Sequence, residues 1–152
     1  MRSLATPKIG HGSTLHPARR IPTVCVVDPQ AADYQDWRKS AEPSGVRLEI
    51  VASAEEALRL SRTQAVDLWV INTALAGRSG FELCSMLKAQ SPQAVVYLVT
   101  DHYTPDVERR ALMARATMFG CKGEHTGWLD AWLETVRRPS GHGSWPNLKS
   151  EI

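Results

Sequence analysis

The chain has 152 residues, of which 43% are hydrophobic and 22% are charged. This length fits one domain, and the composition excludes a chain that is disordered throughout. No stretch approaches the roughly 18 consecutive apolar residues of a transmembrane helix, and the N-terminus lacks the pattern of a secretory signal. Three widely spaced cysteines favour reduced thiols over a disulfide framework or a zinc site. We therefore expect a cytoplasmic protein with no membrane association.

The net charge of +2 is unevenly distributed. Residues 1–21 carry a net charge of +4, and residues 137–152 carry +2. The stretch between them, residues 22–136, holds 11 basic and 15 acidic residues, a net charge of −4. A nucleic-acid-binding domain concentrates basic residues on its folded surface, so we do not expect nucleic acid as the main partner. The basic ends could still add weak, salt-sensitive attraction to polyanions.

Both ends of the chain lack the periodicity of helices and strands. Residues 1–20 and residues 139–152 are rich in small and polar residues, glycine and proline, a composition typical of flexible segments. We therefore expect a flexible basic tail over residues 1–21 and a second flexible tail over residues 139–152. A single domain is expected between them, over residues 22–138.

The first predicted strand covers residues 23–27, a short apolar run rich in β-branched residues. Asp28 and Pro29 follow it and fit an N-cap with proline at the first helical position. Residues 34, 37 and 41 then recur at helical spacing. The sequence therefore predicts a buried strand followed by a helix.

Four more units of this kind follow. Residues 46–50 alternate between apolar and polar, and Ser53 with Glu56 forms a capping box that begins the second helix. The third and fourth predicted strands are residues 68–71 and 94–99, separated by a helix around residues 81–87.

Thr104 and Pro105 then mark the start of the fourth helix. The fifth strand is predicted at residues 117–121, and the fifth helix carries apolar residues at 129, 132, 133 and 136.

Five alternating strands and helices imply an α/β domain with a doubly wound parallel sheet and right-handed crossovers. Ligands of such sheets bind outside the carboxyl ends of the strands. The residues that directly follow or end the predicted strands there are Asp28, Asn72, Thr100, Asp101 and Lys122. These side chains are the candidates for a functional site.

Five phrases of the sequence, in this order, resemble the receiver domain of two-component response regulators. They are VCVVDP, ASAEEALRL, VDLWVINTALAGRSGFELCSMLK, VVYLVT and MFGCKG, within a similarity that spans roughly residues 22–136. The resemblance implies a single flavodoxin-like domain with a five-stranded parallel sheet in the order 2-1-3-4-5. It also implies phosphoryl transfer from a histidine kinase to an aspartate at the end of the third strand.

The sequence departs from this family at the phosphorylation site. The acceptor position is Asn72, whose neutral carboxamide is a poor nucleophile and forms no acyl phosphate. The pair of acids that follows the first strand and helps to hold Mg²⁺ is reduced to Asp28 followed by Pro29. Asp101 adds bulk and negative charge where the family has a small residue. Independently of the resemblance, Asp28 could be only an N-cap, and Asn72 could only bind loop backbone groups.

Other positions match the family. Thr100 and Lys122 correspond to the hydroxyl and the ammonium that contact the phosphoryl oxygens. Phe119 corresponds to the aromatic residue that changes rotamer on activation. Because a partly buried ammonium needs a counter-ion, we expect Lys122 to pair with Asp28 or Asp101.

We therefore interpret the chain as a degenerate receiver, or pseudo-receiver, that signals through protein–protein contacts. It is not expected to be an enzyme or to hold a cofactor or metal, and Mg²⁺ binding should be weak or absent. Two alternatives stay open. The domain could be a working phosphorelay receiver that uses Asp28 or Asp101, or a regulator that contacts nucleic acid through its basic tails.

The resemblance also implies a partner surface. In receivers, the face made by the fourth helix, fifth strand and fifth helix commonly mediates dimerisation or partner binding. Here Trp128, Arg109, Arg110 and Arg115 fall on those helices or directly after one, and Trp and Arg are enriched at binding hot spots. We expect a signalling protein or a second copy of the chain to bind there, unless Trp128 packs against the loop before its helix.

Overall fold

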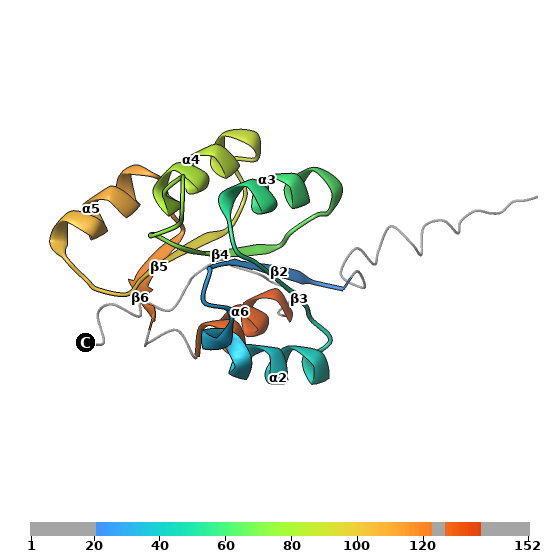
Figure 1. Cartoon of the computed structure of the whole chain (residues 1–152). Helices are drawn as coiled ribbons and strands as arrows, with labels where there is room; N and C mark the ends of the chain where they lie inside the picture. Colours follow the sequence, from blue (N-terminus) through green and yellow to red (C-terminus); the bar gives the residue numbers. More distant parts are fainter. Residues whose placement is uncertain (1–20, 123–126, 138–152) are drawn as a thin grey trace, which may run out of the picture.

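The computed structural model describes residues 21–122 and 127–137 as one α/β domain (Figure 1). The strands are β2 (Thr23–Val27), β3 (Arg47–Val51), β4 (Leu68–Asn72), β5 (Val96–Thr100) and β6 (Met118–Cys121). The helices are the 3-10 helix η2 (Ala31–Tyr34), α2 (Gln35–Ser44), α3 (Ala54–Thr63), α4 (Gly80–Gln90), α5 (Pro105–Met113) and α6 (Trp128–Arg137). The expected tails lie outside the described residues, apart from Ile21.

All strands of the sheet are parallel, and their order is β3-β2-β4-β5-β6. This is the predicted order 2-1-3-4-5 of a flavodoxin-like fold. From β2 the chain moves to β3 on one side, and from β3 it crosses to β4 on the other side of β2, so the switch point lies between β2 and β4. Asp28 and Asn72 flank this point at the carboxyl ends of the two strands.

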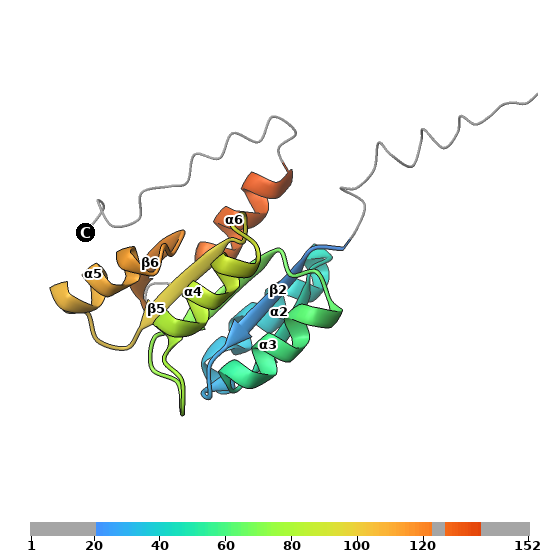
Figure 2. The same cartoon turned by 90° about the horizontal axis from the view of Figure 1, so that it is seen from above.

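Helices cover both faces of the sheet, with α2 and α6 on one face and α3, α4 and α5 on the other (Figures 1 and 2). Successive residues of a strand point to opposite faces. Val24 and Val26 therefore pack toward α2 and α6, whereas Cys25 and Val27 pack toward α3 and α4. The three strands β2, β4 and β5 are buried along their whole length, which explains their uninterrupted apolar sequences.

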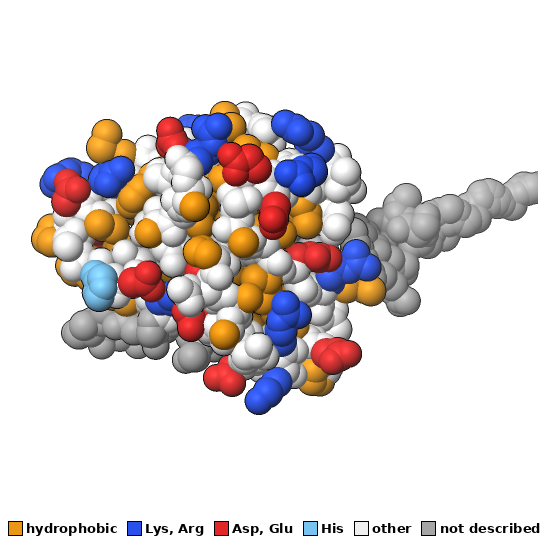
Figure 3. All heavy atoms as spheres, in the orientation of Figure 1, with side chains coloured by type: hydrophobic (Ala, Val, Ile, Leu, Met, Phe, Trp, Pro, Cys, Tyr) orange, Lys and Arg blue, Asp and Glu red, His pale blue; other side chains and the backbone are white. Residues whose placement is uncertain are grey.

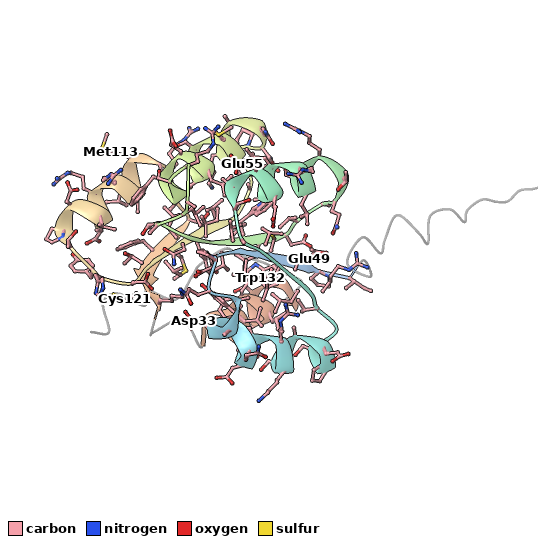
Figure 4. All side chains as sticks on the ribbon, viewed as in Figure 1. Asp33, Glu49, Glu55, Met113, Cys121 and Trp132 are labelled. Atoms are coloured by element: carbon pink, nitrogen blue, oxygen red, sulfur yellow. The ribbon has the colours of Figure 1, made fainter. Side chains whose placement is uncertain are left out.

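Three tryptophans lie at predicted core positions. Trp37 and Trp132 belong to the core on the α2 and α6 side, and Trp69 belongs to the other core. Figure 4 labels Trp132 between the sheet and α6. No helix of the described residues is long and apolar enough to span a lipid bilayer.

Local capping fixes where several helices begin. The Ser53 hydroxyl accepts a hydrogen bond from Glu56 N at 3.2 Å, and Thr104 accepts one from Val107 N at 3.1 Å. Both caps were predicted from the sequence. Before α4, Ser79 forms a reciprocal capping box that the sequence analysis did not identify.

The prediction that Asp28 caps a helix is wrong. Asp28 Oδ1 accepts a hydrogen bond from Gln30 N at 2.9 Å, which forms a turn and not the first turn of an α-helix. A 3-10 helix begins at Ala31, and α2 begins only at Gln35. The reason is that the other oxygen of Asp28 is held inside the site described next.

Candidate functional site

The carboxylate of Asp28, at the end of β2, is fully buried at the centre of a polar cluster. Its Oδ2 accepts hydrogen bonds from the Tyr34 hydroxyl at 2.9 Å and from Asn72 Nδ2 at 3.1 Å. Lys122 Nζ lies 2.8 Å from the same oxygen, while Oδ1 accepts the bond from Gln30 N. Both oxygens of this carboxylate are therefore occupied by groups of the chain itself.

Lys122 follows β6, and only 8% of its surface is exposed. Its Nζ lies 2.8 Å from Asp28 Oδ2, 2.7 Å from Asp33 Oδ2 and 3.7 Å from Asp101 Oδ1. Burial lowers the pKa of the Lys122 ammonium, but the hydrogen bonds to Asp28 and Asp33 outweigh it, so this pKa lies above its ordinary value. The expected pair between Lys122 and Asp28 is confirmed, with Asp101 as a more distant neighbour.

The sequence analysis missed two members of this cluster, Asp33 and Tyr34. Asp33 lies on η2 with a half-exposed side chain (labelled in Figure 4). Tyr34 is buried, and desolvation together with the charge and hydrogen bond of Asp28 raises the pKa of its hydroxyl well above the usual value. The available signal was a second acid five residues after Asp28 in the phrase DPQAAD, which the 3-10 turn carries back to the strand end.

Asn72 is 2% exposed at the end of β4, in the place of the family's phosphoacceptor. Its Oδ1 accepts a hydrogen bond from Ala74 N at 2.8 Å, and its Nδ2 donates to Asp28 Oδ2. The bond from Ala74 N is the contact with the loop backbone that the sequence analysis considered for Asn72. The bond to Asp28 connects Asn72 to the polar cluster. Both the oxygen and the nitrogen of the carboxamide are therefore hydrogen-bonded, and the group carries no negative charge.

The remaining predicted positions surround this cluster without joining its hydrogen bonds. Thr100 is buried, and its hydroxyl donates to the carbonyl oxygen of His102 at 3.1 Å. The Asp101 side chain is 52% exposed. Phe119 is buried, and its ring centre lies 6.2 Å from that of Tyr103, a half-exposed residue before α5. The cluster itself therefore joins Asp28, Asn72 and Lys122, with Asp101 beside it.

Three of the four predicted interface residues have side chains in the described part of the chain, and their surroundings differ. Arg109 is exposed and pairs with Asp106 of its own helix. Arg110 is directed toward α4, where its guanidinium lies over the ring of Phe81, 4.4 Å from the ring centre. A role of Arg110 at a partner surface stays a prediction.

Arg115 has a φ of 68° and ends α5 in the left-handed conformation common at helix C-termini. Two hydrogen bonds, from Arg115 N to Leu112 O at 2.9 Å and from Ala116 N to Ala111 O at 3.1 Å, complete this helix end. Trp128 begins α6, but its side chain lies outside the described part of the chain, so its contacts are not assigned.

The fold family implies a divalent cation at this edge of the sheet, and the cluster does not fit one as it is arranged. Such a cation needs several oxygen ligands with free lone pairs. Here the Lys122 ammonium lies between Asp28 and Asp33, and the third acid of the family's site is the neutral Asn72. Within residues 21–122 and 127–137, no group of three or more His, Cys, Asp or Glu is placed to hold a metal ion.

A doubly wound parallel sheet with an acid, a hydroxyl and a lysine at its strand ends is the arrangement of receiver-like signalling domains, and Asn72 stands in the place of their phosphoacceptor. A sequence model of the response regulator receiver domain matches residues 24–131. The chain therefore belongs to the response regulator receiver domain family and to two-component signalling.

Three similar proteins illustrate the range of this family. The transcriptional regulatory protein YvrH of Bacillus subtilis is 31% identical over 77 residues, which are 50% of this chain and 32% of that protein. A cyclic di-GMP phosphodiesterase of Thermotoga maritima is 27% identical over 97 residues, 64% of this chain and 26% of that protein. The chain thus spans about a third or less of these relatives.

The third is a solved structure, that of a CheY-like response regulator receiver domain protein from Methanospirillum hungatei. It matches with a TM-score of 0.68 at 21% identity, over 76% of this chain and 94% of that one. At this identity, the likeness establishes the fold.

Proposed function

We propose that this receiver domain signals through protein–protein contacts and is not switched by aspartyl phosphorylation. The observation that carries the proposal is Asn72 in the acceptor position, with both ends of its carboxamide hydrogen-bonded. An acyl phosphate forms only when a carboxylate oxygen attacks phosphorus. Asn72 offers no such oxygen, so the usual chemistry of the family has no nucleophile there.

The position of Lys122 supports the same proposal. In a phosphorylatable receiver, this lysine contacts the incoming phosphoryl group, whereas here its ammonium is 2.8 Å from Asp28 and 2.7 Å from Asp33. A divalent cation or a phosphoryl group would have to displace a buried ion pair, and breaking such a pair costs about 3–5 kcal/mol. We propose that the domain works without a metal cofactor and holds this pocket in a single state.

Exposed apolar side chains support a role in protein contacts. Tyr103, Leu112 and Met113 are 50%, 63% and 76% exposed, and all three lie on α5 or on the loop before it. Leu112 and Met113 are adjacent at the end of α5, and exposed hydrophobic side chains that lie together commonly mark interaction sites. Receiver domains are generally not enzymes, and we propose that this one serves as a cytoplasmic binding module for a signalling protein.

The test is incubation of the full chain with acetyl phosphate and Mg²⁺, followed by intact-mass measurement. We expect no added phosphate on the wild-type chain. The matched control is Asn72→Asp, which supplies a carboxylate at the acceptor position while keeping the size of the side chain. Phosphate on the wild-type chain that maps to Asp28 or Asp101 would contradict the proposal and support a working phosphorelay receiver.

A further inference from the structure

A groove runs between α4 and α5, on the face of the sheet away from α2 and α6. It has a volume of about 440 Å³, and its lining includes Arg78, Phe81, Glu82, Met86, Arg110 and Met113. None of the residues that form the Asp28 cluster lines it. The groove is therefore a separate feature, although Arg78 lies on the loop that leads from Asn72 into α4.

The groove offers apolar surface to a partner. Phe81 and Met86 are partly buried along α4, while Met113 is 76% exposed and its neighbour Leu112 is 63% exposed. Figure 4 shows Met113 projecting outward from the end of α5. Methionine side chains adapt their shape to different partners, and exposed apolar residues beside one another favour a binding surface.

Two arginines give the groove its positive charge. Arg110 is held over the ring of Phe81 at 4.4 Å. Arg78 Nε is buried and has no hydrogen-bond partner among the described residues. Neither arginine forms an ion pair with another residue of the described part of the chain. Their positive charges are therefore not paired with an acid of the described part of the chain, and an acidic partner could pair with them.

Glu82 is the one acid among the groove residues named above, and its carboxylate takes part in a hydrogen bond within α4 and its cap. Glu82 Oε1 accepts a hydrogen bond from Ser79 N at 3.3 Å as part of the capping box of α4. Figure 3 shows hydrophobic, basic and acidic side chains interspersed over α4 and α5. The groove is thus a basic and apolar spot on a body, residues 22–136, whose net charge is −4. Arg78 and Arg110 attract a short acidic segment to the groove, whereas the net negative charge of the body disfavours binding of an extended polyanion.

We propose that the groove binds a short amphipathic helix of a protein partner, with acidic residues along one edge and apolar residues on the inserted face. Carboxylates of the partner would pair with Arg78 and Arg110, whose planar guanidinium groups match a carboxylate in two hydrogen bonds. Its apolar residues would cover Phe81 and Met113, as in other helix-in-groove complexes. This inference rests on the proposed function and names the chemistry of the partner.

The test uses three synthetic amphipathic helical peptides that share one leucine and methionine face and differ at the polar edge, which carries Glu, Gln or Lys. Each is titrated into the ¹⁵N-labelled full chain and followed by NMR and fluorescence anisotropy. We expect the Glu peptide to bind most tightly and to shift the amide resonances of α4 and α5. Arg78→Gln and Arg110→Gln should each weaken this binding at least ~10-fold.

Two further variants separate binding from folding. Met113→Glu changes a side chain that is 76% exposed, so it should leave the fold intact. It should still lower the affinity for the Glu peptide at least ~10-fold. Arg62→Gln, on the exposed surface of α3, is the matched control and should change the affinity by less than ~2-fold, because it removes the same charge away from the groove.

Several results would overturn the proposal. These are equal affinity for the Glu and Lys peptides, no binding at millimolar peptide, or resonance shifts outside α4 and α5. Preferential binding of a single-stranded oligonucleotide that depends on the two arginines would assign the groove to nucleic acid. Self-association abolished by Met113→Glu would assign it to a second copy. Phosphorylation of the wild-type chain is measured separately, so failure of the proposed function is distinguished from failure of this inference.

Discussion

Replacing Lys122 with methionine removes the positive charge at the centre of the polar cluster while keeping most of the side-chain volume. The fully buried carboxylate of Asp28 then loses the ammonium that lies 2.8 Å away. Asp33 loses the same ammonium, but its side chain is 48% exposed and is solvated by water. The cost of the substitution therefore comes mainly from an uncompensated charge at Asp28.

The magnitude follows from what remains around Asp28. Removing one partner of a buried ion pair typically costs 3–5 kcal/mol. Asp28 keeps the hydrogen bonds from Tyr34, Asn72 and the backbone of Gln30, at 2.9, 3.1 and 2.9 Å. Because these donors continue to stabilise the carboxylate, we expect a loss of about 2–3 kcal/mol in the free energy of unfolding at neutral pH.

The assay is urea unfolding followed by circular dichroism, with Asp28→Asn/Lys122→Met as the comparison. The double variant removes both charges, so it should be more stable than Lys122→Met alone, and the cycle through Asp28→Asn isolates the pairwise energy. The reasoning is refuted if Lys122→Met costs less than ~1 kcal/mol, or if the effects of the two substitutions simply add.

Three further predictions concern the same region. The pKa of Lys122 is raised in the folded state, so its stabilising contribution is complete below pH 10.5 and is lost as the pH rises through the folded-state pKa. The difference in melting temperature between the wild type and Lys122→Met should therefore shrink in alkaline solution. Calorimetry should detect no saturable Mg²⁺ binding to the wild type at millimolar concentration, because groups of the chain occupy both oxygens of Asp28; saturable binding would contradict this. Gly80→Ala should destabilise the fold by at least ~2 kcal/mol in urea unfolding, because its Cβ would lie 2.1 Å from Asn72 O; an unchanged midpoint would contradict this.

The fold was predictable because its signals are local. The apolar run at residues 23–27 identifies a buried strand, and Ser53 and Thr104 mark helix starts through bonds to residues only three positions away. The five-stranded order then follows from the family resemblance. Side chains fixed by tertiary contacts gave no comparable signal. Arg110 turns toward α4 because of Phe81, which is distant in sequence.

The candidate site was predictable only in part, for a similar reason. Strand ends converge at one edge of a parallel sheet, so Asp28, Asn72 and Lys122 could be grouped from the sequence. The contribution of Asp33 depends on η2, and the sequence favoured an α-helix beginning at Pro29. A capping role for Asp28 failed because one of its oxygens is held by three partners inside the cluster.

Asn72 and Lys122 are linked through Asp28, and this link bears on the proposal that the domain is not phosphorylated. Asn72 contributes no charge, so the acids nearest to Lys122 Nζ are Asp28 and Asp33. A carboxylate at position 72, beside Asp28, would compete for the same ammonium. Asp33, which is half exposed, would then lose its counter-ion and turn toward solvent. The neutral carboxamide therefore leaves Lys122 available to hold η2 near the end of β6 through Asp33, and we propose that the missing nucleophile and a pocket fixed in one state share this cause.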